Sequence, residues 1–292
     1  MTRRAGRAIA HWAERARAAW PAGPLSLLIT GLALFWSVAA AAPAAGTSAV
    51  KPAAPVRLRP SAPLAGTASA GNPAVGALFT TSDGRLGTHF CTASVVDSPA
   101  GDLLVTAAHC VSGYSDADPA DLAFAPGYAN GRAPYGIWTV TRIFVDSAWA
   151  ASADPDDDVA FLQVALHAGN TSVEDVTGSE RLPVSRPSTG VVRVIGYPQT
   201  RNQPISCQNR ISVFASGQLE FDCANFTNGT SGAPFLTDVD SATGDGTVIG
   251  VIGGYQQGGS SSDVSYAATF RRNVLSLFGT AVRGSGRVAR PR

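Results

Sequence analysis

The chain has 292 residues, of which 45% are hydrophobic and 15% are charged, so it can bury a substantial core. A formal net charge of +1 gives no basis for binding nucleic acid or another polyanion. Its 31 glycines and 19 prolines favour a turn-rich β protein over a helical one.

The first 42 residues have the features of an export signal. Several arginines precede an uncharged apolar run over Leu25–Ala42, and the run ends in small residues where a signal peptidase could cut. The run is also long enough for a marginal membrane span, but no cluster of positive residues follows it to stop transfer. We therefore predict a signal peptide over 1–42, a secreted bacterial protein, and no membrane contact beyond the signal.

The remaining chain divides into a linker, a folded domain and a tail. Residues 43–72 are rich in alanine, proline, glycine and serine and predict a linker or short pro-segment. Short β-like runs then recur between turn residues, as in a sandwich or barrel, and a polar segment over 169–187 divides them into two sets. One helical pattern follows, over Arg271–Phe278. We expect a folded domain over 73–282 and a disordered tail over 283–292.

Three segments together indicate a nucleophilic site. Ser231 lies between glycines in NGTSGAP, which taken alone is typical of a turn. A nucleophilic serine needs a base to take its proton and a carboxylate to orient that base. His109 in TAAHC and Asp158 in DVAFL supply both, each next to an apolar run. The histidine and the aspartate lie in the first set of strands and the serine in the second, so we expect the site in a groove between the two halves.

Asp158 is one of four aspartates in a short acidic run. It directly precedes the apolar residues VAFL, which places it at the start of a buried strand. The other three, Asp154, Asp156 and Asp157, are expected to lie in a solvated loop.

Four cysteines in an exported chain suggest two disulfides, for which three pairings are possible. We favour Cys91 with Cys110 and Cys207 with Cys223, because each pair then stays within one half. The sequence has no Cys-x-x-Cys and no histidine pair at ligand spacing, so it predicts no metal site.

The segments at 106–110, 158–162 and 229–234 resemble the three signature segments of chymotrypsin-like serine proteases, and the likeness covers roughly residues 74–282. The strand ending at Tyr197-Pro198 and the uncharged residue before the serine are most similar to the bacterial glutamyl-endopeptidase-like branch and to other secreted trypsin-like enzymes. The resemblance implies an all-β fold, a double six-stranded β-barrel of chymotrypsin type, with the active site at the barrel junction and a C-terminal helix.

The resemblance also implies a role for each site residue. Ser231 would attack the scissile carbonyl after His109 takes its proton, and Asp158 would orient the imidazole and stabilise it when charged. The backbone N–H groups of Gly229 and Ser231 would form the oxyanion hole.

Substrate-binding residues follow from the same resemblance. The position six before the serine lies at the base of the primary pocket in the family, and here it is Asn225, followed by Phe226. Trypsin-like enzymes have an aspartate there, so basic specificity is not supported. The histidine that glutamyl specificity uses on the strand near Gly253 and Gly254 is absent. These two glycines could let a substrate strand approach and extend the sheet, although the pair is equally compatible with a simple turn.

The residue before the nucleophile bears on activation. Digestive relatives have an aspartate there that pairs with the ammonium of a newly cut N-terminus, whereas this chain has Thr230. An ammonium buried against an uncharged hydroxyl would lack compensation. We therefore expect local hydrogen bonds to order the oxyanion loop, and chains beginning anywhere from Pro43 to Asn72 to be about equally active.

The sequence thus predicts a secreted, monomeric serine endopeptidase that hydrolyses polypeptide substrates through an acyl-enzyme, without a metal or organic cofactor. An esterase with the same triad is an alternative, and so is a non-catalytic binding domain on a protease scaffold, because fold alone does not establish function. The intact set of His109, Asp158, Ser231 and Gly229 argues against the binding domain.

Overall fold

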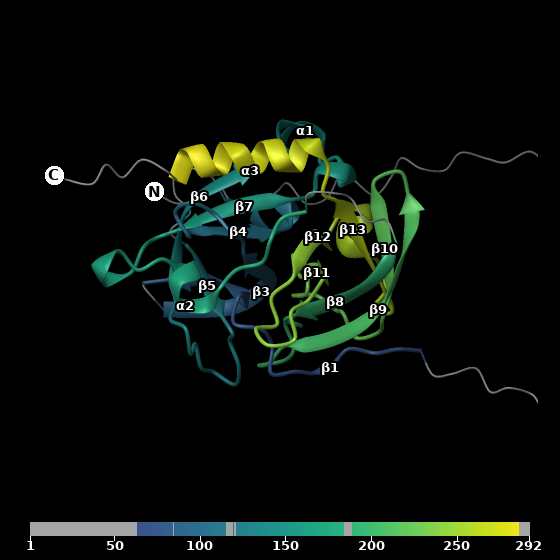
Figure 1. Cartoon of the computed structure of the whole chain (residues 1–292), viewed down its shortest axis with the longest axis horizontal. Coiled ribbons are helices and arrows are strands. Elements are labelled where there is room, and N and C mark those ends of the chain that lie inside the picture. Colours follow the sequence, from purple (N-terminus) through teal and green to yellow (C-terminus); the bar gives the residue numbers. More distant parts are fainter. Residues whose placement is uncertain (1–62, 84, 115–118, 120, 184–188, 286–292) are drawn as a thin grey trace, which may run out of the picture. The chain divides into compact units, whose positions relative to one another are not determined.

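The computed structural model describes residues 63–83, 85–114, 119, 121–183 and 189–285 (Figure 1). The predicted signal and most of the predicted linker lie outside the described residues. Among the described helices, none is long and apolar enough to cross a membrane.

The first half of the described chain forms a closed barrel of antiparallel strands in the order β2-β3-β4-β7-β6-β5. Its core combines leucine and alanine with aromatic and β-branched residues, which favour strands, and Trp138, Phe124 and Phe161 are fully buried there. The strands are β2 (Val75–Ser82), β3 (Arg85–Val95), β4 (Leu103–Thr106), β5 (Leu122–Pro126), β6 (Trp138–Val145) and β7 (Ala160–Val164).

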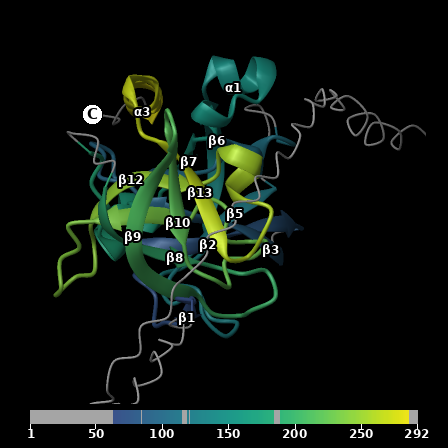
Figure 2. The same cartoon turned by 90° about the vertical axis from the view of Figure 1, so that its right-hand side faces the viewer.

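The second half forms a ring of six strands, which faces the viewer in Figure 2. The sheet runs β9-β10-β13-β12-β11-β8, and the pairing of β8 with β9 closes it. The predicted double six-stranded barrel is therefore confirmed. The strands are β8 (Gly190–Gly196), β9 (Ile205–Ala215), β10 (Gln218–Asp222), β11 (Pro234–Thr237), β12 (Thr247–Ile252) and β13 (Val264–Thr269).

The predicted C-terminal helix is present and extends further than expected. This helix, α3 (Arg272–Ser285), lies across β6 and β7 (Figure 1). Its last turn is held because the side chain of Arg142 donates a hydrogen bond to the carbonyl of Gly284 (2.9 Å). Residues 283–285 are therefore helical and not part of a disordered tail, and 286–292 lie outside the described residues. The shorter helices are η1 (Ala108–Val111), α1 (Ser147–Ser152), η2 (Pro155–Asp157), η3 (Ala168–Asn170), α2 (Val173–Thr177) and η4 (Tyr255–Gly258).

Residues 63–72 belong to the folded domain and not to a linker, contrary to the sequence prediction. The N–H of Gly66 donates to the carbonyl of Ala224 (2.8 Å), and the N–H of Ala224 donates to the carbonyl of Leu64 (2.8 Å). The next residues form β1 (Thr67–Ala68), which pairs with β9. A Cβ on Gly66 would lie only 2.8 Å from the side chain of Ile205. The small residues that suggested a linker are thus what lets this segment lie against the barrel.

We expect a chain that begins at Pro73 to be less stable than one that begins at Pro63. The shorter chain lacks β1 and also Asn72, whose side chain donates to the buried Glu180 (3.1 Å) and to the carbonyl of Gly244 (2.8 Å). Losing these contacts should lower the free energy of unfolding by about 2–4 kcal/mol. Urea unfolding of both chains measures the difference. Equal unfolding midpoints would contradict this.

The segment between the barrels carries a buried acid that contacts both of them. The backbone N–H of Glu180 donates to the carbonyl of Val95 at the end of β3 (2.9 Å). Its carboxylate accepts hydrogen bonds from the side chain of Asn72 (3.1 Å) and from the backbone N–H of Gly246 beside β12. Burial raises the pKa of this carboxyl from 4.5 to about 7; the hydrogen bond from Gly246 opposes the rise, and the nearby charge of Asp245 adds to it.

This raised pKa predicts a pH-dependent contribution of Glu180 to stability. The folded protein binds the proton more tightly than the unfolded chain, so the contribution is fully present below about pH 4.5 and is lost as the pH rises through about 7. Its size should be on the order of 1–3 kcal/mol. We expect Glu180→Gln, which cannot titrate, to lack this loss. Urea unfolding of both proteins between pH 4.5 and 8 is the measurement, and parallel stability curves would contradict the assignment.

Candidate active site

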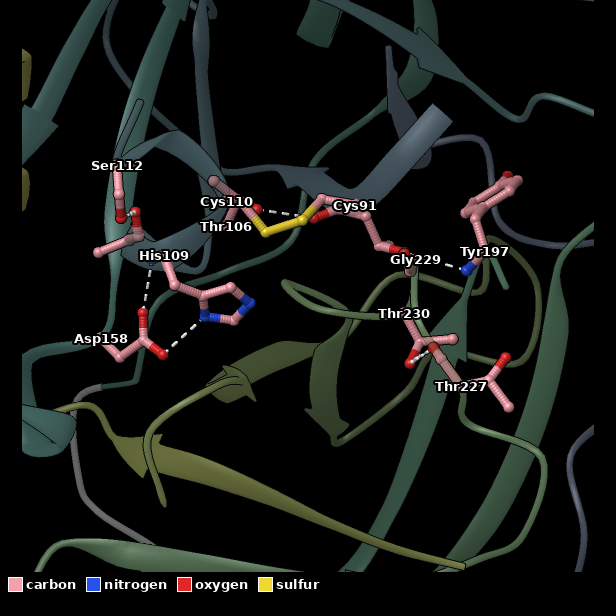
Figure 3. Close-up of a disulfide and its surroundings, with 12 residues drawn as sticks. Cys91, Thr106, His109, Cys110, Ser112, Asp158, Tyr197, Thr227, Gly229 and Thr230 are labelled. Carbon is pink, nitrogen blue, oxygen red and sulfur yellow. Dashed lines mark hydrogen bonds and ion pairs between the residues drawn. A yellow bond between two sulfur atoms is a disulfide. The ribbon is translucent and has the colours of Figure 1, made fainter. Parts of the chain in front are cut away.

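His109 and Asp158 form a close pair at the barrel junction. Oδ2 of Asp158 accepts a hydrogen bond from Nδ1 of His109 (2.8 Å), and Oδ1 accepts one from the backbone N–H of His109 (2.8 Å) (Figure 3). The aspartate is fully buried, whereas the side chain of His109 is 12% exposed. Because Nδ1 donates to the carboxylate, Nε2 is the basic nitrogen of the neutral imidazole. Nε2 has no hydrogen-bond partner among the described residues, so it can accept a proton.

The second barrel also binds Asp158. Its Oδ2 accepts a hydrogen bond from the backbone N–H of Gly254 (2.8 Å). A Cβ on Gly253 would lie 3.0 Å from the same oxygen, which is tighter than most Cβ contacts, so a glycine favours this close approach. The N–H of Gly253 donates to the carbonyl of Tyr266 (3.0 Å). Both N–H groups of the glycine pair are therefore engaged, which leaves the carbonyl of Gly253 as the group that could bind a substrate backbone.

Two of the aspartates expected in a solvated loop contact side chains that lie far along the chain. The side chain of Gln218, at the start of β10, donates to Asp156 (2.7 Å), and Arg271 forms an ion pair with the same residue (3.1 Å). The side chain of Asn273 donates to Asp157. Both side chains are half-buried, so they are only partly solvated, and residues distant in sequence fix the loop just before the buried aspartate. The first aspartate of the run is exposed, as expected.

Ser231 lies in a tight turn between two glycines. Gly229 and Gly232 have φ angles of 98° and 83°, a region that glycine adopts readily. A Cβ on Gly232 would lie 2.2 Å from Oγ1 of Thr106. Because Thr106 ends β4 just before His109, this packing brings the serine segment beside the histidine. No hydrogen bond joins Ser231 Oγ to His109 Nε2 among the described residues, and such a contact is often long until substrate binds.

The loop before the serine leaves two backbone donors free. The N–H groups of Gly229 and Ser231 donate to no described residue. In contrast, every carbonyl from residue 227 to residue 231 accepts a hydrogen bond. The turn therefore occupies its acceptors and keeps these donors available, as an oxyanion hole requires.

A pocket of about 400 Å³ lies beside Ser231. Phe226 lines it together with residues 257–262, and none of the described residues in its lining is charged. Asn225 does not line the pocket as the sequence analysis expected. Its side chain is exposed and donates to the carbonyl of Gly66 (3.1 Å), so it holds the N-terminal segment instead.

Comparison with known families identifies the family of the chain. A sequence model of the family described as trypsin-like peptidase domain matches residues 87–251, more than half of the chain. The chain belongs to this family. It is a trypsin-like peptidase, and a search of curated protein sequences found no significant match.

Solved proteases share the fold of this trypsin-like peptidase. Protease Anisep from Arthrobacter nicotinovorans aligns with a TM-score of 0.61 and 23% identity, over 75% of this chain and 99% of that one. The thermostable serine protease AL20 from an extremophilic microorganism aligns with a TM-score of 0.60 and 22% identity, over 74% of this chain and 99% of that one. A Glu endopeptidase in complex with MPD aligns with a TM-score of 0.57 and 16% identity, over 75% of this chain and 97% of that one. At these identities the likeness shows the chymotrypsin-type fold.

One side of the pocket of this trypsin-like peptidase was not predicted from the sequence. Residues 257–262 form one side of the pocket. Gly258 and Gly259 have φ angles of 104° and 124°, so the run of glycines and serines there signals a tight loop. Nothing local in that run signals that it lies beside Ser231.

The two disulfides of the peptidase join Cys91 to Cys110 and Cys207 to Cys223, the pairings favoured from the sequence. The first links β3 to η1 next to His109. Cys91, Cys110 and His109 lie close enough together to hold a metal, but both sulfurs belong to the disulfide and are not thiolates. This group is therefore not a metal site.

Proposed function

We propose that this peptidase is a secreted serine endopeptidase in which Ser231, His109 and Asp158 are the catalytic residues. The observation that supports this most is the hydrogen bonding of Asp158. Its carboxylate accepts bonds from His109 in one barrel and from Gly254 in the other, all at 2.8 Å. The imidazole is thereby oriented with its basic nitrogen free at the junction that also holds the serine.

The reaction follows from these positions. Ser231 Oγ attacks the scissile carbonyl while Nε2 of His109 takes the hydroxyl proton. The carbonyl oxygen becomes an oxyanion that the free N–H groups of Gly229 and Ser231 stabilise. Collapse of the intermediate breaks the C–N bond, and the imidazolium gives its proton to the leaving amine. Water then repeats the sequence on the acyl-enzyme and releases the new carboxylate.

The surroundings of the serine support an endopeptidase. The carbonyl of Gly253 has no hydrogen bond among the described residues and can accept one from a substrate backbone N–H. An exopeptidase binds a charged chain terminus at its site, which requires a complementary charge. The described lining of the pocket offers none. These features fit an uncharged internal segment of a polypeptide.

Secretion is supported by the cysteines. All four are paired in disulfides, which form and persist in oxidising compartments outside the cytosol. The predicted export signal over 1–42 agrees with this location.

We expect a fluorophosphonate probe to label the protein at Ser231 and Ser231→Ala to abolish both labelling and peptide hydrolysis. Losing the nucleophile of a serine protease typically lowers kcat on the order of a million-fold. Peptide mapping of the labelled protein and assay of the variant are the measurements. Labelling without hydrolysis of any peptide, but with ester hydrolysis, would favour an esterase. Residual peptidase activity above about a thousandth of wild type would identify the wrong serine.

We expect substrates with an uncharged side chain before the scissile bond to be preferred. A charged side chain would lose its hydration in a pocket whose described lining holds no opposite charge. The kcat/KM for Lys, Arg, Asp or Glu at this position should be at least about tenfold below that for the best uncharged residue. A peptide library varied at that position measures this. A dominant preference for glutamate would contradict it and would favour the glutamyl-endopeptidase-like branch.

A further inference from the structure

Thr92, a fully buried residue of β3, connects several parts of the site. Its hydroxyl donates a hydrogen bond to the carbonyl of Gly229 (3.0 Å) and accepts one from the N–H of Tyr197 (3.0 Å). Its backbone N–H donates to the carbonyl of Ser231 (2.7 Å), and its carbonyl accepts a bond from the hydroxyl of Thr106 (2.8 Å). Three of these partners, Gly229, Tyr197 and Thr106, are labelled in Figure 3. One residue of the first barrel thus binds the loop over 226–233 that carries Ser231 (the serine loop), the end of β8, and the strand that leads to His109.

These bonds hold the backbone of the serine loop, which carries the two N–H groups of the proposed oxyanion hole. Thr92 holds the carbonyls of Gly229 and Ser231, and the N–H of Gln199 holds the carbonyl of Asn228 (2.7 Å). With the carbonyls before and after the Cα of Gly229 both held, the φ and ψ angles of that residue are fixed. In a trans peptide the N–H of Gly229 points opposite to the carbonyl of Asn228, which Gln199 holds. Thr92 holds the peptide that follows, so Gly229 cannot turn about its own φ and ψ angles.

Within the part of the chain that the structure describes, no charged group joins this network. Thr230, before the nucleophile, donates from both its hydroxyl (2.8 Å) and its N–H (3.1 Å) to the carbonyl of Thr227. The other partners of the loop are backbone groups and the hydroxyl of Thr92. All of these hydrogen-bond partners belong to the two folded barrels, so none of them has to be created by cleavage of the chain. Within the segment at 63–72, moreover, Thr67 and Ala68 pair with β9, and Leu64 and Gly66 bond to Ala224.

We propose that Thr92 is a positioning residue of the oxyanion hole: by holding the carbonyls of Gly229 and Ser231 it keeps the loop in its active arrangement without a charged contact from a processed terminus. This inference rests on the proposed function and adds to it the residue that organises the hole. Threonine suits the place because its hydroxyl can donate to one strand and accept from another at once. Valine has the same shape without that hydroxyl, and it would leave the carbonyl of Gly229 and the N–H of Tyr197 unpaired.

The test compares Thr92→Val, Thr92→Ser and a matched control, Thr177→Val. Thr177 has a buried hydroxyl that donates to the carbonyl of Val173 within α2 (2.9 Å), so the control loses an equivalent buried hydrogen bond away from the loop. We expect Thr92→Val to lower kcat about 10- to 100-fold, less than the loss of an oxyanion donor itself, with KM changed by less than about threefold. Thr92→Ser should recover most of the kcat, and Thr177→Val should keep it.

Two further readouts separate positioning from general destabilisation. A peptide boronic acid forms a tetrahedral adduct that uses the hole, so its affinity should fall by the same factor as kcat in Thr92→Val. The pH profile of kcat/KM should keep its shape, because the contacts of His109 with Asp158 do not involve Thr92. Hydrogen exchange of the loop peptide over 226–233 should become faster in Thr92→Val and stay unchanged in Thr177→Val.

The outcomes decide between the possibilities. Unchanged kcat and boronate affinity in Thr92→Val, a loss that serine does not restore, or an equal loss in Thr177→Val would each overturn the proposal. Fluorophosphonate labelling of the wild type reports the proposed function separately. If the wild type is not labelled, that function is wrong, and the exchange experiment still decides whether Thr92 orders the loop: faster exchange in Thr92→Val alone supports it, and unchanged exchange overturns it.

Discussion

The site depends on one buried carboxylate that both barrels must satisfy. Asp158 is fully buried, and a buried charge without hydrogen bonds would cost several kcal/mol. Its three donors are two nitrogens of His109 and the backbone N–H of Gly254. Since the first barrel supplies the histidine and the second supplies the glycine, the carboxylate is fully bonded only when the barrels are docked. The same contact that completes the fold also orients the imidazole.

The rest of the junction is organised mainly by neutral groups. Gly232 packs so closely on Thr92 that a Cβ would lie 2.1 Å from the carbonyl of that residue. The serine loop is consequently held by backbone carbonyls and hydroxyls, and the pocket beside it is uncharged in its described lining. Charged pairs occur further out, as between Arg271 and Asp156, where they fix the loop that precedes the buried aspartate. This division explains how the loop can be ordered without an ammonium group near the serine.

The sequence singled out the candidate site residues from local pattern, and their catalytic roles stay a proposal. His109, Asp158 and Ser231 each lie in a short segment whose neighbours set the backbone, and dividing the chain into two halves was enough to choose the cysteine pairs. Contacts between distant residues could not be predicted in this way. Gly66 looked like part of a linker because its fit against Ile205 depends on a strand far along the chain.

The long-range hydrogen bonds were equally invisible in the sequence. Nothing near Asp156 indicates that Gln218 binds it, and nothing near Thr92 indicates that its hydroxyl reaches Gly229. Asn225 was placed in the pocket by position along the chain, whereas its exposed side chain instead holds the N-terminal segment. Side-chain direction at a turn depends on the backbone angles there, and Asn225 has a positive φ of 79°.

The most direct test of this account is a crystal structure of the protein with a peptide boronate bound. The account predicts a covalent bond from Ser231 Oγ to boron, with one boronate oxygen about 2.7–3.1 Å from the backbone nitrogens of Gly229 and Ser231. The hydroxyl of Thr92 should still donate to the carbonyl of Gly229, and His109 should still contact Asp158. An adduct on another serine, or a carbonyl of Asn228 turned into the place of that oxygen, would contradict it.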